Sequence, residues 1–175
     1  MESLCASLFA KVDEQLERTG YLVAILPEDQ LGWAPAIGGA WPAGRLLGHL
    51  LDCAAGFCAV LAAAEPELAA SLSGLRAMPV NQYCGAVEAR ERLATYRACL
   101  EQGFARLPDA CLCRKVATVF VSEGETVLTL ILGNLEHLIN HKHQLFTYLK
   151  LMGRPVSSGD LYQFRGSPPY QEAPR

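Results

Sequence analysis

Four long segments of this 175-residue chain carry apolar residues at helical spacing, and a proline or glycine follows each segment within two residues. The segments cover residues 4–26, 44–64, 87–107 and 126–152. An amphipathic helix needs another element against which to bury its apolar face, and the four predicted helices can supply this to one another. The spacing therefore predicts an all-α fold, an antiparallel four-helix bundle.

The length of the chain fits one domain over residues 1–175, which would bury about 70% of the surface exposed by the unfolded chain. Hydrophobic residues make up 51% of the sequence and charged residues 19%, a composition that excludes general disorder. The net charge of -3 leaves no broad basic surface to attract phosphate backbones. We therefore expect no nucleic-acid partner.

The sequence also indicates where the protein resides. No uninterrupted apolar run approaches the roughly 20 residues that a membrane-spanning helix needs, so no membrane partner is expected. The first residues lack the basic region of a signal peptide, which favours a cytoplasmic location. The seven cysteines are an odd number without regular spacing, and in a reducing compartment we expect them to be free thiols.

Two segments between the predicted helices are less regular. Residues 27–43 combine several prolines and glycines with two tryptophans, which predicts a long ordered loop. Residues 116–121 are rich in β-branched and aromatic side chains, which favours a short strand or hairpin, with an extended loop as the alternative. Ser122 and Glu125, just before the last helix, have the residue types of a capping box.

The end of the chain differs in composition from the helical segments. From about residue 156 onward it is rich in proline and glycine, and we expect an irregular tail there. Tyr162 and Phe164 are the side chains expected to hold this tail over the bundle.

Three of the four histidines lie in the last predicted helix, and two of them, His137 and His141, are four residues apart. Residues at this spacing share one helix face, so both imidazoles can reach a single ion. His143 is turned about 200° from His141 around the helix axis. We therefore expect His143 to face solvent or a subunit contact.

The fourth histidine, His49, lies among leucines of the second predicted helix, where an imidazole without a partner would leave a buried polar nitrogen. If the second and last helices face each other, His49 adds a third nitrogen to a metal site with open positions. The alternative is a set of histidines that only make hydrogen bonds in the core. Asp52 and Asn134 are candidates to orient imidazoles or to coordinate the metal, with exposed or capping roles as the alternative.

A nucleophilic cysteine is a competing hypothesis. Cys53 and Cys58 lie in an alanine-rich helix suited to tight packing, which argues against reactive thiols. Cys111 and Cys113 precede two basic residues that would favour a thiolate, but no base is fixed beside them. The histidines therefore carry the stronger prediction.

Residues 41–52, WPAGRLLGHLLD, place a tryptophan eight residues before the first histidine. Residues 137–144, HLINHKHQ, carry two histidines four apart, and the sequence YLKLMG follows at 148–153. These two segments resemble the signatures of the second and last helices of the DinB-like (YfiT-like) superfamily of metalloproteins. Pro42 stands where the family commonly has serine, and Lys142-His143 where it usually has Arg-Gly. These departures are expected to alter the start of the second helix and the surface beside the site.

The resemblance implies a four-helix bundle, often a homodimer, that binds a divalent ion such as zinc or nickel through His49, His137 and His141. Characterised relatives include bacillithiol transferases and a mycothiol-dependent maleylpyruvate isomerase. A metal-dependent transferase that activates a low-molecular-weight thiol is therefore expected, with no catalytic residue assigned. Its small-molecule substrate would enter from the loop that holds Trp33 and Trp41. The alternatives are a metal-dependent hydrolase and a noncatalytic helical stress-response or interaction protein.

Overall fold

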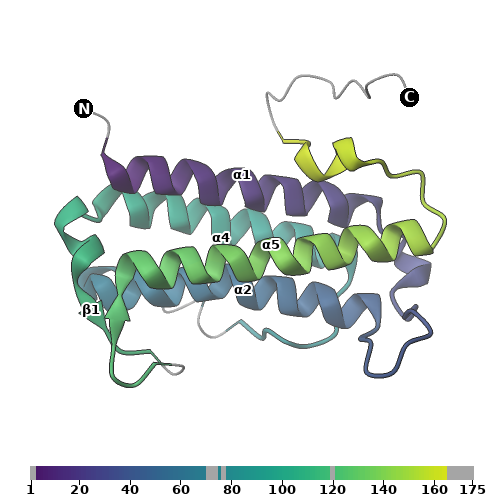
Figure 1. Ribbon diagram of the computed structural model, residues 1–175, viewed down its shortest axis with the longest axis horizontal. Coiled ribbons are helices and arrows are strands. Elements are labelled where there is room, and N and C mark those ends of the chain that lie inside the picture. Colours follow the sequence, from purple (N-terminus) through teal and green to yellow (C-terminus); the bar gives the residue numbers. More distant parts are fainter. Residues whose placement is uncertain (1–2, 70–74, 76–77, 119–120, 165–175) are drawn as a thin grey trace.

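The computed structural model of the protein describes residues 3–69, 75, 78–118 and 121–164. Four long helices lie side by side in a bundle (Figure 1). Each begins and ends within one residue of its predicted bounds. The all-α prediction is confirmed, and the helices are α1 (Leu4–Ile25), α2 (Ala43–Ala64), α4 (Ala86–Arg106) and α5 (Val127–Leu151).

The four helices form a ring in which α1 and α2 each pack against both α4 and α5. The start of α1 lies beside the end of α4, because the Leu4 and Cys5 amides each donate to the Asp109 carboxylate at 2.9 Å. The pairs α1/α4 and α2/α5 are antiparallel, as predicted (Figure 1). Helices α2 and α4 instead begin at the same end of the bundle, where the Cys84 amide donates to the Gly44 carbonyl oxygen at 3.0 Å.

Helix α2 is the most buried of the four, with 15 of its 22 residues inside the bundle. It is also the one helix of the described residues that is long and apolar enough to cross a membrane, with a mean hydropathy of 1.8. However, 67% of that stretch is buried among the other helices. Its apolar composition therefore matches its place as the central packing surface of the bundle.

The loop before α2 compensates for the missing serine cap. Pro42 occupies the cap position and makes no side-chain hydrogen bond to the helix. The first two amides of α2, from Ala43 and Gly44, donate instead to the carbonyl oxygens of Trp33 and Leu31, each at 2.8 Å. Loop carbonyls thus satisfy amides that a serine hydroxyl would otherwise help to satisfy, and they tie the loop to the helix.

A short hairpin precedes α5, in agreement with the prediction for this region. Its strands, β1 (Lys115–Val116) and β2 (Glu125–Thr126), pair in antiparallel register. The strands are shorter than the predicted run of residues 116–121, of which residues 119–120 lie outside the described residues.

The predicted capping box of Ser122 and Glu125 is wrong. Thr126 is the N-cap of α5, and its hydroxyl accepts a hydrogen bond from the Thr129 amide at 3.2 Å. Strand pairing is the physical reason, because it holds Glu125 in an extended conformation opposite Val116 and the helix begins only where this pairing ends. The capping residue is therefore the last residue of the hairpin.

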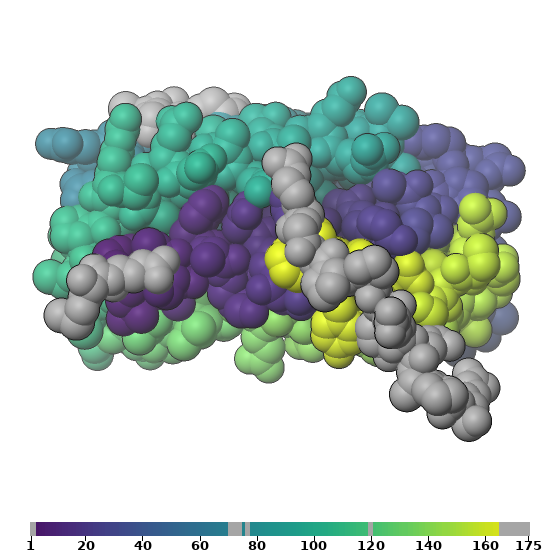
Figure 2. Space-filling view, turned by 90° about the horizontal axis from the view of Figure 1, so that it is seen from above, coloured from purple at the N-terminus to yellow at the C-terminus, as the bar shows by residue number. Residues whose placement is uncertain are grey.

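The tail after α5 folds back over α1. Residues Ser158–Tyr162 form a 3-10 helix, η3, so the prediction of an irregular tail is wrong for these residues. The predicted anchors are confirmed, since the Arg18 guanidinium lies 5.3 Å from the ring centre of Tyr162 and 5.1 Å from that of Phe164. Figure 2 shows this yellow segment against α1, in purple, with α4 and α5 on either side.

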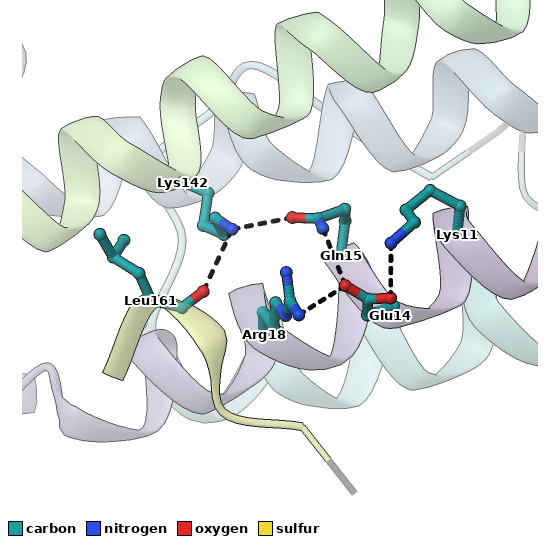
Figure 3. A network of polar contacts seen from close by, with 6 residues as sticks. All are labelled: Lys11, Glu14, Gln15, Arg18, Lys142 and Leu161. Atoms are coloured by element: carbon teal, nitrogen blue, oxygen red, sulfur yellow. Dashed lines mark hydrogen bonds and ion pairs between the residues drawn. The ribbon is translucent and has the colours of Figure 1, made fainter. Parts of the chain in front are cut away.

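Lys142 ties the tail to two helices from inside the molecule. Its side chain is only 5% exposed, and its ammonium group donates to Gln15 Oε1 at 2.8 Å and to the Leu161 carbonyl oxygen at 3.3 Å (Figure 3). Burial is the main cause that lowers the pKa of Lys142 to about 8, and the nearby charge of Arg18 acts in the same direction. Of the two residues that depart from the family pattern here, Lys142 therefore faces α1 and η3, whereas His143 is exposed.

We expect Lys142 to make the protein relatively more stable as pH rises. Between pH 8 and 10.5 the folded state binds fewer protons at this amine than the unfolded state does, so this group's contribution to the free energy of unfolding increases with pH. The difference in free energy of unfolding between wild type and Lys142→Met should shift by about 2 kcal/mol in favour of wild type over that range. Urea unfolding of both proteins at four pH values measures this difference in free energy. Both proteins contain the same cysteines and tyrosines, so the titration of these groups cancels in the difference.

The matched control is Lys150→Met, which removes an exposed lysine from the same helix. Its difference from wild type should stay constant across the same pH values. A constant difference for Lys142→Met as well would contradict the proposed effect of burial.

Candidate metal centre

His49, His137 and His141 meet between α2 and α5. His49 lies in the second turn of α2, and the other two lie one turn apart in α5. His49 Nε2 is 3.0 Å from His137 Nε2 and 3.1 Å from His141 Nε2. His143 is exposed, as predicted, and its ring lies beside that of Phe146. The structure thus brings together the three histidines that the sequence singled out and separates the fourth from them.

Hydrogen bonds at the outer ring nitrogens fix the protonation of two of these histidines. His49 Nδ1 lies 2.5 Å from Asn81 Oδ1, and His141 Nδ1 lies 2.9 Å from Gln144 Oε1. An amide oxygen only accepts hydrogen bonds, so each Nδ1 carries a proton and each neutral ring presents a lone pair at Nε2. Two lone pairs 3.1 Å apart repel each other unless a cation lies between them.

This arrangement fits a divalent metal ion. In a tetrahedral site with metal to nitrogen distances of 2.0–2.1 Å, the ligand nitrogens are about 3.3 Å apart, close to the separations found here. Burial is the main cause that lowers the pKa of both His137 and His141, and the neighbouring His49 lowers both further. Low pKa values keep the rings neutral near pH 7, the form that binds a metal.

Cys53 is part of the same cluster, although the sequence did not single it out as a ligand. His49, Cys53 and His137 offer potential ligand atoms that all lie within 4.8 Å of one another. Cys53 lies one turn after His49 on the same face of α2, and this spacing of four was the available signal. Its Sγ is 3.6 Å from His137 Nδ1, whereas the other histidines lie at the Nε2 side of that ring.

Cys53 contacts the outer nitrogen of His137, as the side-chain amides of Asn81 and Gln144 contact those of the other two histidines. Burial, and secondly the charge of Asp52, raises the pKa of the Cys53 thiol to about 12, so the sulfur stays uncharged at pH 7. The sulfur meets the outer nitrogen of His137, while His137 Nε2 faces the other histidines. The three-histidine ligand set stays a prediction, and a set of His49, Cys53 and His137 is the alternative that the structure offers.

The other cysteines named above lie outside this cluster. Burial raises the pKa of Cys58 to about 12, so this thiol does not supply a thiolate at pH 7. Cys111 and Cys113 belong to η2 (Asp109–Cys113), and the residue after it, Arg114, accepts a hydrogen bond from the first amide of α5. These two thiols are therefore at the hairpin end of the bundle, away from the histidines.

Trp41 covers one side of the histidine cluster. Its ring stacks on His141, with 6.2 Å between ring centres and 17° between the planes, and meets His49 edge-on at 4.9 Å. The Tyr148 hydroxyl donates to the Trp41 carbonyl oxygen at 3.1 Å and accepts from Gln144 Nε2 at 3.2 Å. The loop before α2 is thereby linked, through Gln144, to the hydrogen bond that fixes His141.

Asn81 reaches His49 because a glycine of α2 leaves room for the segment before α4. A Cβ at Gly48 would lie 1.6 Å from the Gln82 carbonyl oxygen, so no larger residue fits at this position. The Asn81 amide donates to the Gly48 carbonyl oxygen at 3.0 Å, and Asn81 has a φ of 58°, a conformation that asparagine tolerates. No sequence motif marked Asn81, whose role depends on this close approach.

A cavity of about 770 Å³ adjoins the cluster at His137 and extends between α2 and α5 toward the hairpin. Trp33 and Trp41 are not among the residues that line it, and the entry of substrate from the tryptophan loop stays a prediction. Asp52, which is half-buried, lines the cavity, and Asn134 donates to the Cys53 carbonyl oxygen at 2.7 Å. Neither residue caps a helix or contacts an imidazole nitrogen by a hydrogen bond among the described residues.

The sequence profile of the DinB superfamily matches residues 11–145, a range that includes all three clustered histidines. The chain belongs to the DinB superfamily. Its fold is similar to the crystal structure of a DinB-like protein, YjoA, from Bacillus subtilis, with a TM-score of 0.67 and 20% sequence identity. The similarity covers 91% of this chain and 99% of that one. No curated protein sequence matches the chain.

For this DinB-superfamily protein we expect metal binding to depend on the three clustered histidines. His49→Ala, His137→Ala and His141→Ala should each retain less than about a tenth of the metal that wild type holds, because each removes a nitrogen ligand. Elemental analysis at pH 7 of protein purified without nickel resin measures this. His143→Ala, the matched control on an exposed face of α5, should keep its metal.

Cys53→Ser separates the two possible ligand sets. If Cys53 only supports His137, the variant should keep its metal with an affinity reduced by about tenfold or less. Full metal loss in Cys53→Ser together with retention in His141→Ala would show that the ligands are His49, Cys53 and His137.

Asn81→Gly tests the hydrogen bond that orients His49. Glycine retains the positive φ of this position and removes the side-chain acceptor, so the backbone need not move. Loss of such an outer contact is expected to lower metal affinity about 10- to 100-fold, as measured by competition with a chelator. Asn140→Ala, which removes an exposed amide from α5, should leave the affinity unchanged.

Proposed function

We propose that the protein is a metal-dependent transferase that joins a low-molecular-weight thiol to a small electrophilic substrate. The observation that carries the proposal is the convergence of the three histidines, one of which, His137, lines an open cavity. His49, His137 and His141 would hold a divalent ion, with zinc or nickel as the favoured metals. Held by neutral ligands, such an ion keeps its positive charge and lowers the pKa of a thiol that reaches it.

The nucleophile in this proposal is an external thiol. The two buried cysteines of α2, Cys53 and Cys58, have pKa values raised to about 12 and are held among packed side chains. In the transfer, the thiol gives its proton to solvent in the open cavity, and a sulfur lone pair forms the new S–C bond. The bond from that carbon to the leaving group breaks, and the leaving group departs with the electron pair.

The chain's own residues position and shield this reaction. Trp41 packs on His141 and His49 and does not line the cavity, so it shields the side of the cluster that it contacts. Asn81, Gln144 and Cys53 hold the three rings through their outer nitrogens, which keeps the inner lone pairs aimed at one point. The accessible cavity favours chemistry over a purely structural metal site, which would be closed.

The free cysteines support the expected location of the protein in the cytoplasm. All seven cysteines are free, which fits the reducing conditions of the cytoplasm, the compartment that we propose.

Leu132 and Ile139, seven residues apart on α5, are 47% and 37% exposed. These apolar side chains on an outward face of α5 support the proposal of a homodimer.

The decisive experiment is a thiol-conjugation assay with bacillithiol, mycothiol and cysteine against an aryl halide. We expect conjugation by the metal-loaded protein to fall at least 100-fold when the metal is removed and to return on reconstitution. His137→Ala should behave like the stripped protein, and His143→Ala like wild type. Undiminished conjugation by fully stripped wild-type protein would refute the proposal.

A further inference from the structure

The wall of the cavity beyond His137 is formed by small, apolar side chains. Ala59 and Ala63 lie one turn apart on α2 and are exposed to the cavity, and Leu130 and Gly133 line it from α5. Because three of these four residues are alanine or glycine, a space remains between two helices that pack closely elsewhere. An apolar chain placed along this wall would gain free energy for each methylene group removed from water.

The end of the cavity near His137 has a different chemistry. Asp52 lines it, and among the described residues the Asp52 carboxylate makes no hydrogen bond or ion pair. Asn134 also lines it, with its Nδ2 donating to the Cys53 carbonyl oxygen and its Oδ1 directed toward Gly56. No lysine or arginine of the described residues borders the cavity. A ligand therefore meets oxygen acceptors and a negative charge at this end.

A carboxylate beside an apolar cavity favours a ligand that carries the opposite charge. A protonated amine supplies a positive charge and three donors, which can serve the oxygens of Asp52 and Asn134 together. A carboxylate or phosphate ligand would be repelled, and a neutral ligand would leave the charge of Asp52 unpaired.

We propose that this cavity binds a small aliphatic ammonium compound, with its cationic end at Asp52 and its apolar chain along Ala59 and Ala63. The proposal rests on the proposed function in one respect only, which is that the ammonium compound is the class of substrate brought to the histidines. The binding site itself depends on α2 and α5 side chains that are not metal ligands.

The test is calorimetric titration of the metal-loaded protein at pH 7 with n-hexylamine, n-hexanol and hexanoate as probes. We expect hexylammonium to bind at least tenfold more tightly than hexanol, and hexanoate to bind most weakly. In Asp52→Asn the preference of amine over alcohol should disappear. Asp29→Asn, which removes the same charge from an exposed site outside the cavity, should keep it.

Ala59→Phe tests the apolar wall, since it fills the cavity from an exposed position and should weaken amine and alcohol alike. Equal affinities for hexylammonium and hexanol in wild type, a measurement that needs no variant, would overturn the proposal. An amine preference that survives in Asp52→Asn would overturn it as well. A preference that is lost in metal-stripped wild type would show that the amine binds the metal and would also count against the Asp52 site.

Because these titrations contain no thiol and no electrophile, they fail or succeed independently of the transferase proposal. Absence of conjugation would leave the amine site standing, and absence of amine preference would leave metal-dependent conjugation standing.

Discussion

The mutual repulsion of three closely spaced imidazole lone pairs is the constraint on which the functional part of this structure depends. Lone pairs about 3 Å apart repel each other, and outward protons together with a cation between the rings would offset this repulsion. The outward protons need acceptors, and the fold supplies one from a different place for each ring. Asn81 comes from the segment before α4, Gln144 from the next turn of α5, and Cys53 from α2. The bundle therefore positions the three histidines and, around them, the residues that contact their outer nitrogens. These outer contacts account for the glycine at position 48 and the positive φ of Asn81, which helix packing alone does not explain.

The helices could be predicted from the sequence because their signal is spread over many residues. An apolar stripe of 20 or more residues tolerates local irregularity, and its ends are marked by proline or glycine, so the bounds were found to within one residue. The start of α5 shows where a short motif fails. Ser122 and Glu125 have the right residue types, but the pairing of β1 with β2 holds Glu125 extended and passes the cap to Thr126. A contact between strands outweighed a local preference.

The three histidines were found for the same reason, since a spacing of four on one helix is a local property. The roles of their supporting residues were not predicted, and only Asn81 among these residues depends on tertiary approach alone. Asn81 reaches His49 only because the chain passes directly over Gly48, and no residue pattern near Asn81 indicates this close approach. Cys53 did carry a local signal, four residues after His49, but its alanine-rich surroundings suggested packing alone. A cysteine can be buried in the core and also contact a histidine, and Cys53 does both.

Helix α5 shows how one element serves two unrelated sites through its periodicity. His141 points to α2 and the metal site, and Lys142, turned by about 100°, points to α1 and η3. The buried amine of Lys142 anchors the tail, so two adjacent residues connect α5 to opposite parts of the molecule. The residues of α5 that line the cavity carry no long charged side chain; they are Thr129, Leu130, Gly133, Asn134 and His137. The negative charge of Asp52 therefore meets no cation from α5, and the cavity keeps the polarity that selects its ligand.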